Sequence, residues 1–311
     1  MDPVIQVKHL TKQFSEIKAV DDLSFTVAAG QVYGFLGQNG AGKSTTIRML
    51  LTLIKPTSGV IEIFGLDLEK HRKEILRQTG AVIERPDLYK YLTALENLRI
   101  FANMSGQKIS EKKLMDQLAM VGLAERAHSK VKTYSQGMKQ RLGIATALVH
   151  DPKLIILDEP TNGLDPQGIA DIRNLIINLS RQMGKTLLIS SHLLSEMEII
   201  AHSMLIIDKG KKLVEGEVKD LFDPARTLAE LHTTNDGESF EKLSRSPLAG
   251  LLKARRNDCI VLQLHRDEIT STLKQLLAMD IPVLSFRSRH SLEDYFLSLT
   301  TGENYVEAAA N

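Results

Sequence analysis

The stretch "GQNGAGKST", residues 37–45, decides the fold class of this 311-residue chain. It fits the pattern G-x-x-x-x-G-K-[ST], whose backbone N–H groups hold phosphate oxygens. The short apolar run "QVYGFLG" leads into it, and "KSTTIRMLLTLI", which has helical periodicity, continues from it. This order of strand, glycine-rich loop and helix indicates a phosphate-binding α/β fold and argues against a glycine-rich turn that only caps a helix.

The residues of this loop share the work of holding a triphosphate. We expect its glycines to let the backbone curl tightly, because a Cβ there would obstruct the approach of phosphate oxygens. Lys43 can reach the β- and γ-phosphates, and the Ser44 hydroxyl can ligate Mg²⁺. The helix N-terminus adds a favourable dipole. The predicted nucleotide-binding residues of the loop are Gly37, Asn39, Gly40, Ala41, Gly42, Lys43, Ser44 and Thr45.

Two further apolar strands end in polar side chains suited to the same site. "KLIILDEP" is typical of a strand buried on both faces of a parallel sheet, and Asp158 at its end can hold Mg²⁺ directly or through water. Glu159 can polarise an attacking water as a general base. "KTLLISSH" ends in His192, which can hydrogen-bond a γ-phosphate and position that water. Alone, Asp158-Glu159 is an ordinary acidic turn and His192 a helix cap or core residue. Beside the phosphate loop we predict catalytic roles for Lys43, Glu159 and His192.

A second helix start also has the equipment to hold an anion. "KTYSQGMKQRLG", residues 132–143, presents the Ser135 hydroxyl, Gly137 and free backbone N–H groups at the beginning of a helix. The ordinary alternative is an N-cap, in which Ser135 satisfies its own helix, and the two roles are compatible. The apolar positions Met138, Leu142, Ala145 and Val149 predict one buried stripe along this helix.

Composition limits the class of protein. The 39 basic and 38 acidic residues give a net charge of +1, which does not favour a non-specific nucleic-acid binder, and we expect no nucleic-acid partner. Cys259 is the single cysteine, which we interpret as a small buried hydrophobe and which rules out an internal disulfide. We see no signal peptide and no apolar run long enough to cross a bilayer. We therefore expect a cytosolic chain, and at a membrane another chain would supply the spans.

Strands that alternate with helices predict a doubly wound α/β core. The opening segments "VIQVKHLTKQF" and "IKAVDDLSFTVAAG" predict an antiparallel sheet, and "GVIEIFGLDL" and "SMLIIDKGKKLVEGE" predict hairpins. Residues from about 86 to 150 are mainly helical in pattern, and "GIADIRNLIINLSRQ" predicts an amphipathic helix. The pattern changes near Glu217. Further on, "GESFEKLSRSPLAG", residues 237–250, is interpreted as polar and turn-rich. "CIVLQLH", "EITSTLKQLLAMD", "VLSFRS" and "SLEDYFLSLT" then predict a separate α+β unit.

Together these motifs resemble the nucleotide-binding subunit of an ATP-binding-cassette (ABC) transporter over residues 1 to about 217. The resemblance implies a P-loop NTPase of the ABC type, with a mixed core sheet, an antiparallel β subdomain and a helical subdomain at about 86–150. It makes "YSQGM" the family signature and "TNGLDP" the D-loop, and it implies that Phe14 stacks on adenine. It also implies that Ser135 and Gly137 face the γ-phosphate of ATP on a second ATPase subunit, so that two chains, possible as a homodimer, enclose two ATP.

Two positions depart from the family pattern. The signature usually reads Leu-Ser-Gly-Gly-Gln, but Ser135 and Gly137, the parts that face phosphate, remain. Glu84, in "GAVIERPDLY", stands where the family usually has a glutamine that senses Mg²⁺ and the water. Ionised Glu84 can bind Mg²⁺ but cannot donate an amide hydrogen bond, and a solvated carboxylate at a strand end is the alternative. The "IERPDLY" variant looks like that of antibiotic-peptide and bacitracin-type exporter ATPases.

The resemblance also implies partners and a location. The family places a groove for a cytoplasmic helix of an integral-membrane permease near Leu88, Tyr89, Tyr91, Leu92 and Leu95, which otherwise form the core of a helical subdomain. Residues 218–311 resemble the accessory C-terminal domain of ABC-2-type exporter ATPases, with "SLEDYFLSLT" the recognisable piece. We therefore expect an exporter ATPase with ATP and Mg²⁺ as cofactors, cytoplasmic and peripheral on the membrane through its permease. The alternatives are an import-type ATPase with a regulatory tail and a non-transport ABC ATPase acting on nucleic acid or ribosomes.

Overall fold

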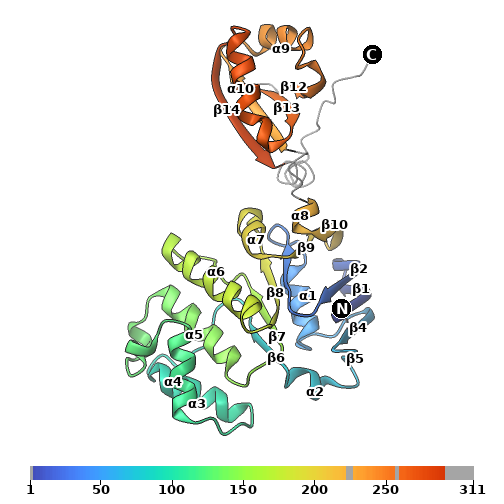
Figure 1. Cartoon of the computed structure of the whole chain (residues 1–311). Coiled ribbons are helices and arrows are strands. Elements are labelled where there is room, and N and C mark those ends of the chain that lie inside the picture. The colour runs from blue at the N-terminus through green and yellow to red at the C-terminus, as the bar shows by residue number, and fades with distance from the viewer. Residues whose placement is uncertain (1–2, 222–226, 256–258, 291–311) are drawn as a thin grey trace. The chain divides into compact units, whose positions relative to one another are not determined.

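The chain divides into two compact units, Met1–Glu217 and Val218–Asn311 (Figure 1). The computed structural model describes residues 3–221, 227–255 and 259–290. Each unit has its own sheets and its own apolar core, so each is described by itself.

The first unit is built on a six-stranded sheet with the strand order β10-β9-β3-β8-β7-β6. Strands β3, β7 and β8 are buried at every position, which explains why the apolar residues in their centres are consecutive rather than alternating with polar ones. All neighbours are parallel except the β9–β10 hairpin. The strands are β3 (Val32–Leu36), β6 (Thr79–Val82), β7 (Leu154–Asp158), β8 (Thr186–Ser191), β9 (Ser203–Asp208) and β10 (Lys211–Glu217).

The register of this sheet places the ends of three central strands side by side. Leu36 of β3 lies opposite Ser191 of β8, and Asp158 of β7 lies opposite Ser190 of β8. The segments that leave these strands therefore meet at one edge of the sheet, where open α/β sheets bind their ligands. These segments are the glycine-rich loop, Glu159 and His192.

An antiparallel sheet, in the order β2-β1-β4-β5, covers one face of the six-stranded sheet. Its strands are β1 (Pro3–Phe14), β2 (Ile17–Ala28), β4 (Ser58–Ile63) and β5 (Leu66–Asp67). Phe25 stacks on Tyr33 and Phe35 across the shared core, with ring centroids 5.9 and 5.6 Å apart. Helix α1 (Lys43–Leu50) contributes Ile47 and Met49 to the same core.

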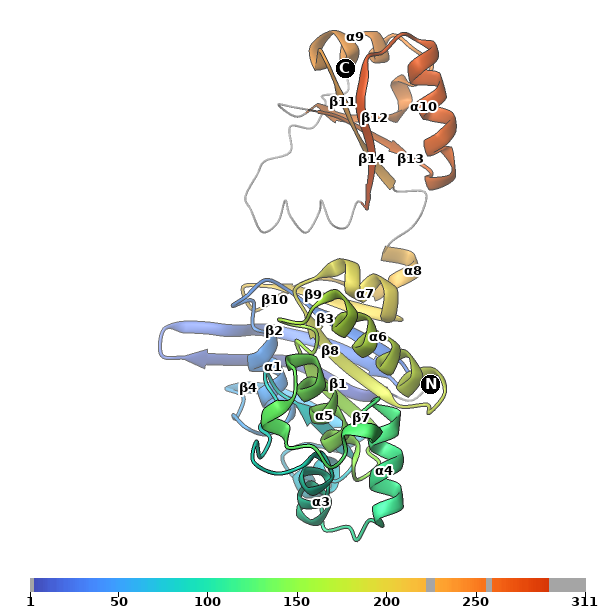
Figure 2. The ribbon, with the colours of Figure 1, turned by 90° about the vertical axis from the view of Figure 1, so that its left-hand side faces the viewer.

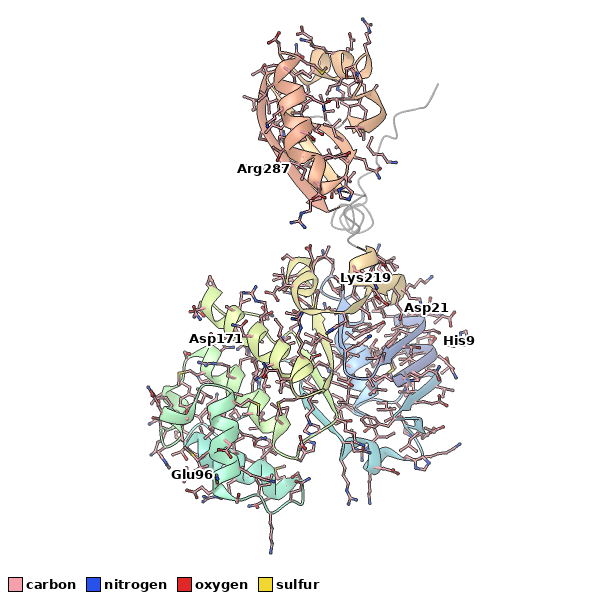
Figure 3. The ribbon with its side chains drawn as sticks, viewed as in Figure 1. His9, Asp21, Glu96, Asp171, Lys219 and Arg287 are labelled. Carbon is pink, nitrogen blue, oxygen red and sulfur yellow. The ribbon has the colours of Figure 1, made fainter. Side chains whose placement is uncertain are left out.

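Helices occupy the other face and one end of the unit. Helices α6 (Pro166–Arg181) and α7 (Leu194–Ile200) pack on β8, and α2 (Arg72–Leu76) packs on β6. Helices α3 (Ala94–Met104), α4 (Glu111–Met120) and α5 (Gln136–Leu148) form one group in both ribbon views (Figures 1 and 2). Asp171 on α6, labelled in Figure 3, lies 3.7 Å from a guanidinium nitrogen of Arg141 on α5, which ties this group to the core.

The second unit begins with the short helix α8 (Val218–Leu221) and contains a β-α-β-β-α-β arrangement. The order β12-β13-β11-β14 is antiparallel throughout, which is the split β-α-β topology. Leu231, Leu243, Leu262 and Leu276 meet in its core. Its elements are β11 (Thr227–Thr233), α9 (Asp236–Ser244), β12 (Leu252–Arg255), β13 (Ile260–Leu264), α10 (Ile269–Ala278) and β14 (Val283–His290).

The α/β class and the antiparallel opening are confirmed, as are the two predicted hairpins, β4–β5 and β9–β10. Three local predictions were wrong. The helix after the glycine-rich loop ends at Leu50, and Thr52 has a left-handed backbone with φ 58°. Helix α5 is buried on most sides, including Gly143 and Ile144, and not along one stripe, because α3, α4, α6 and β6 all pack on it.

The third wrong prediction concerns "GESFEKLSRSPLAG", which contains most of α9 rather than turns. The Asn235 side chain caps this helix by accepting the backbone N–H of Glu238, and Leu243 packs into the core. Strands β11 and β12 were not predicted. "SLEDYFLSLT" lies outside the described residues.

Candidate nucleotide-binding site

The glycine-rich loop joins β3 to α1 under tight backbone constraints. Gly42 precedes the first helical residue with φ +107°, and a Cβ on it would lie 2.5 Å from the Ala19 carbonyl oxygen. A Cβ on Gly37 would lie 2.6 Å from the Ile207 carbonyl oxygen. These two glycines are therefore required by neighbouring protein backbone. From the sequence we expected glycine here because a Cβ would obstruct the approach of phosphate. The structure adds that a Cβ at Gly37 or Gly42 would also clash with protein backbone.

Lys43 is held inside the loop that it follows. Its side chain is 5% exposed, and Nζ donates a hydrogen bond of 2.7 Å to the Gly37 carbonyl oxygen. Nζ also lies 3.2 Å from Oε1 of Glu159. A buried ammonium needs such partners, so the loop carbonyl and one carboxylate compensate its charge in this structure.

Glu159 contacts two predicted catalytic residues at once. Its Oε1 faces Lys43, and its Oε2 lies 2.8 Å from Nδ1 of His192. When Nδ1 carries the proton and donates to the carboxylate, Nε2 of a neutral imidazole is left as an acceptor. The backbone of Glu159 has φ 49°, an uncommon conformation for a residue with a side chain. The structure thus brings Lys43, Glu159 and His192 together as one cluster.

Asp158 fits a role as a ligand of a divalent cation. It is 1% exposed, and its Oδ1 accepts a hydrogen bond from the Ser190 hydroxyl. Its Oδ2 is buried and has no hydrogen-bond partner among the described residues. A carboxylate oxygen left in this way is a suitable ligand for Mg²⁺, which accepts oxygen donors. Ser44, at the start of α1, is half-buried.

Glu84 lies at the surface and pairs with a different residue. Its side chain is 62% exposed, and Oε1 accepts a hydrogen bond of 2.5 Å from Arg48 of α1. Its backbone is left-handed, with φ 55°. The Glu84 carboxylate thus contacts a guanidinium, and among the described residues no hydrogen bond joins it to Ser44 or Asp158. This arginine was not identified from the sequence, since the two residues are 36 positions apart.

Phe14 lies at the end of β1, next to the turn into β2, and is 48% exposed. Nζ of Lys12 is 4.8 Å from the centroid of its ring. An exposed aromatic with a cation over one face can offer the other face to a planar base. In the glycine-rich loop, Asn39 and Gly40 are exposed, Ala41 is buried and Thr45 is half-buried.

The second anion-binding element begins α5. Ser135 is exposed and caps the helix by accepting the backbone N–H of Met138 at 3.2 Å. A Cβ on Gly137 would meet only the Gly168 Cα at 3.9 Å, an ordinary contact, so packing does not require a glycine there. Tyr134 is buried, which raises the pKa of its hydroxyl, and it donates to the Arg126 carbonyl oxygen at 2.6 Å. The N-cap role is present, and the helix N-terminus remains open to an anion.

A phosphate-binding loop, a buried carboxylate and a His–Glu–Lys cluster at the edge of a parallel sheet define a P-loop nucleotide-binding protein. Residues 20–162 match the family described as ABC transporter. The Bacitracin transport ATP-binding protein BcrA of Bacillus licheniformis is 43% identical over 304 residues, 97% of this chain and 99% of BcrA. The ABC transporter ATP-binding protein YhcH of Bacillus subtilis (strain 168), itself uncharacterized, is 40% identical over 99% of both chains.

A solved structure agrees with these relatives. The dimeric ATP-binding cassette MJ0796, bound to ADP and Pi, superimposes with a TM-score of 0.62 and 26% identity over 69% of this chain and 98% of that one. The chain therefore belongs to the ATP-binding subunits of ABC transporters. It is an ATP-binding protein and an ATPase coupled to transport, and the resemblance predicted from the motifs is confirmed. Among the described residues, no helix is both long and apolar enough to cross a bilayer.

Proposed function

We propose that this chain is the ATP-hydrolysing subunit of an exporter, acting as a dimer around two ATP and driving a separate integral-membrane permease. In this assignment, residues 1–217 form the nucleotide-binding domain and residues 218–311 an accessory domain. ATP binds with Mg²⁺, for which Ser44, Asp158 and Glu84 are the proposed ligands. The protein works at the cytoplasmic face of the membrane, where the permease holds it.

The dimer is proposed because the two phosphate-binding elements, the glycine-rich loop at α1 and the N-terminus of α5, lie in different parts of the first unit. Helix α1 packs on β2 and β7, whereas α5 packs on α3, α4, α6 and β6. Ser135 is exposed at the open N-terminus of α5, where the helix dipole favours an anion. In the proposed dimer, ATP bound to the glycine-rich loop of a second copy presents its γ-phosphate to this helix N-terminus. The dimeric MJ0796 structure supports the same arrangement.

The permease proposal rests on exposed aromatics held on a fixed turn. Tyr89 and Tyr91, between β6 and α3, are 50% and 79% exposed. Asn97, fully buried, accepts the backbone N–H of Tyr89 at 2.9 Å and donates to its carbonyl oxygen at 3.1 Å. Exposed aromatic side chains on a rigid segment are typical of an interaction site.

The start of α3 fixes this segment further. Thr93 caps the helix in a reciprocal pair with Glu96, which is labelled in Figure 3. The backbone N–H of Thr93, which donates to the carboxylate, lowers the pKa of Glu96. The carboxylate is therefore ionised, and the cap formed, throughout the neutral pH range. The turn that carries the tyrosines thus has a stable frame on its C-terminal side.

Export is favoured over import by the similarity to BcrA, a bacitracin transport protein, across 97% of this chain. The test expresses the chain with the membrane protein encoded beside it in a bacitracin-sensitive host. We expect growth at higher concentrations of a peptide antibiotic, lost on Lys43→Ala. If the Lys43→Ala variant, expressed with the same membrane protein, protected the host as well as the wild type does, ATP-driven export would be contradicted. Co-purification with ribosomes or nucleic acid in place of the membrane protein would favour a non-transport ATPase.

A further inference from the structure

Ser190, in the middle of the site, links the two adjacent carboxylate residues by a single hydroxyl. It is the fifth residue of β8 and is fully buried. Its Oγ accepts a hydrogen bond of 2.8 Å from the backbone N–H of Glu159 and donates one of 2.5 Å to Oδ1 of Asp158. The strand register explains the contact, because Ser190 lies directly opposite Asp158.

The direction of each hydrogen bond follows from the chemistry of its partners. A backbone N–H can only donate, so Ser190 Oγ is the acceptor from Glu159. An ionised carboxylate can only accept, so the hydroxyl proton points to Asp158. One group that accepts and donates at the same position is required here. Serine and threonine meet this requirement, alanine removes both bonds, and cysteine is a weak donor and a weak acceptor.

These two bonds determine the orientation of the atoms proposed to act on ATP. Because Oδ1 of Asp158 is occupied by Ser190, Oδ2 is the oxygen left buried and unpartnered. The hydrogen bond from the Glu159 N–H to Ser190 holds the backbone of Glu159 at φ 49°. Such a conformation occurs where the surrounding contacts enforce it. From that backbone the Glu159 carboxylate reaches Lys43 and His192.

We propose that Ser190 is a positioning residue for ATP hydrolysis: its hydroxyl presents Asp158 Oδ2 to the divalent cation and fixes the backbone from which Glu159 acts. This inference rests on the proposed roles of Asp158 and Glu159. Among the described residues, the Ser190 hydroxyl is hydrogen-bonded to Glu159 and Asp158 and not to the P-loop or Lys43. Its effect should therefore be largest in the response to Mg²⁺ and in turnover. Mutation of a residue that hydrogen-bonds to a metal ligand, without binding the metal itself, lowers metal affinity or activity by about 10–100-fold.

The test compares Ser190→Ala, Ser190→Cys and Ser190→Thr in the full chain. A fluorescent ATP analogue is titrated in EDTA and in Mg²⁺, and the hydrolysis rate is measured against Mg²⁺ concentration. For Ala and Cys we expect binding of the analogue to be retained in EDTA, with an increase of about tenfold in the Mg²⁺ concentration for half-maximal rate and a lower kcat. Threonine keeps a hydroxyl that can both accept and donate, so Ser190→Thr should keep the wild-type Mg²⁺ response and kcat. Cys has nearly the shape of serine, so it tests the chemistry if the Ala variant does not fold.

Ser180→Ala is the matched control, since this serine is 4% exposed and donates to the Gly30 carbonyl oxygen away from the carboxylates. It should leave the Mg²⁺ response at the wild-type value. A wild-type Mg²⁺ response in folded Ser190→Ala or Ser190→Cys would overturn the inference, even if stability fell. Failure of the wild-type chain itself to bind or hydrolyse ATP would overturn the proposed function instead, so the two failures are distinguishable.

Discussion

The contact between Lys43 and Glu159 predicts that Glu159→Gln tightens ATP binding by the isolated subunit. In this structure Lys43 Nζ lies 3.2 Å from Glu159 Oε1, in surroundings where the two side chains are 5% and 16% exposed. The phosphates of ATP need the same ammonium, so they must displace this carboxylate. Glutamine removes the competing charge and also the repulsion between a carboxylate and the incoming phosphates. It can still accept a hydrogen bond from His192.

The magnitude follows from the geometry. At 3.2 Å and an effective dielectric constant of about 20, the Coulomb attraction of the pair is about 5 kcal/mol. Desolvation of both groups offsets most of this, and hydrogen bonds to charged groups contribute about 1.5–3 kcal/mol net. Because the pair lacks hydrogen-bond geometry at Oε1, we take the lower end of this range and expect ATP binding to gain about 1.5 kcal/mol. That is about tenfold in Kd.

The assay is a titration of a fluorescent ATP analogue in EDTA at low protein concentration. Without Mg²⁺ hydrolysis is blocked, and at low concentration dimers are not favoured, so a lower Kd reports the isolated pocket. Glu196→Gln is the control, because this carboxylate accepts from Thr161 and does not face Lys43. If Glu159→Gln bound the analogue with the wild-type Kd or more weakly, the competition argument would be refuted. In Mg²⁺ the same variant should lose turnover and accumulate as an ATP-bound dimer.

Three further substitutions test other parts of the site. Lys43→Ala should abolish measurable ATP binding in the same titration, because no other described side chain supplies a buried cation to the loop; unchanged affinity would contradict the P-loop role. Phe14→Ala should weaken binding about tenfold through the loss of one stacked base, worth about 1–3 kcal/mol, and should weaken inosine and adenine nucleotides alike. Glu84→Gln should leave binding largely intact and change turnover or its stimulation by the permease. A wild-type rate of the variant in both the isolated subunit and the full complex would instead identify Glu84 as a solvated carboxylate paired with Arg48.

The sequence predicts those parts of the site that are formed by local motifs, but not those that depend on contacts between distant segments. The glycine-rich loop is a local motif, so Lys43 and its neighbours could be found from nine consecutive letters. Asp158 and His192 follow from another local signal, a polar residue at the end of a buried strand. Ser190 carries no such signal, because its contact with Asp158 depends on which residues of β7 and β8 lie opposite each other. Strand register is set by the whole sheet, and a single sequence does not state it.

The same distinction explains the errors in the second unit. Helix α9 has a cap at Asn235 and only a few apolar residues, because one face meets the small core and the other faces solvent. Its polar composition therefore resembles a loop. The pair of Arg48 and Glu84 is another tertiary feature, formed when α1 and the end of β6 come together. Tertiary contacts override local propensity in such segments.

The arrangement of Glu159 connects ATP binding with the preparation of the proposed base. In this structure Oε1 faces Lys43 and Oε2 faces His192, so both carboxylate oxygens have cationic or hydrogen-bonding partners. When phosphate takes Lys43, Oε1 is released while the backbone bond to Ser190 and the contact with His192 remain available. One oxygen is then free to accept a proton from water, and its position is still fixed by the sheet. Binding of ATP therefore breaks the contact between Lys43 and Glu159 and leaves one oxygen of the proposed base free to act on water.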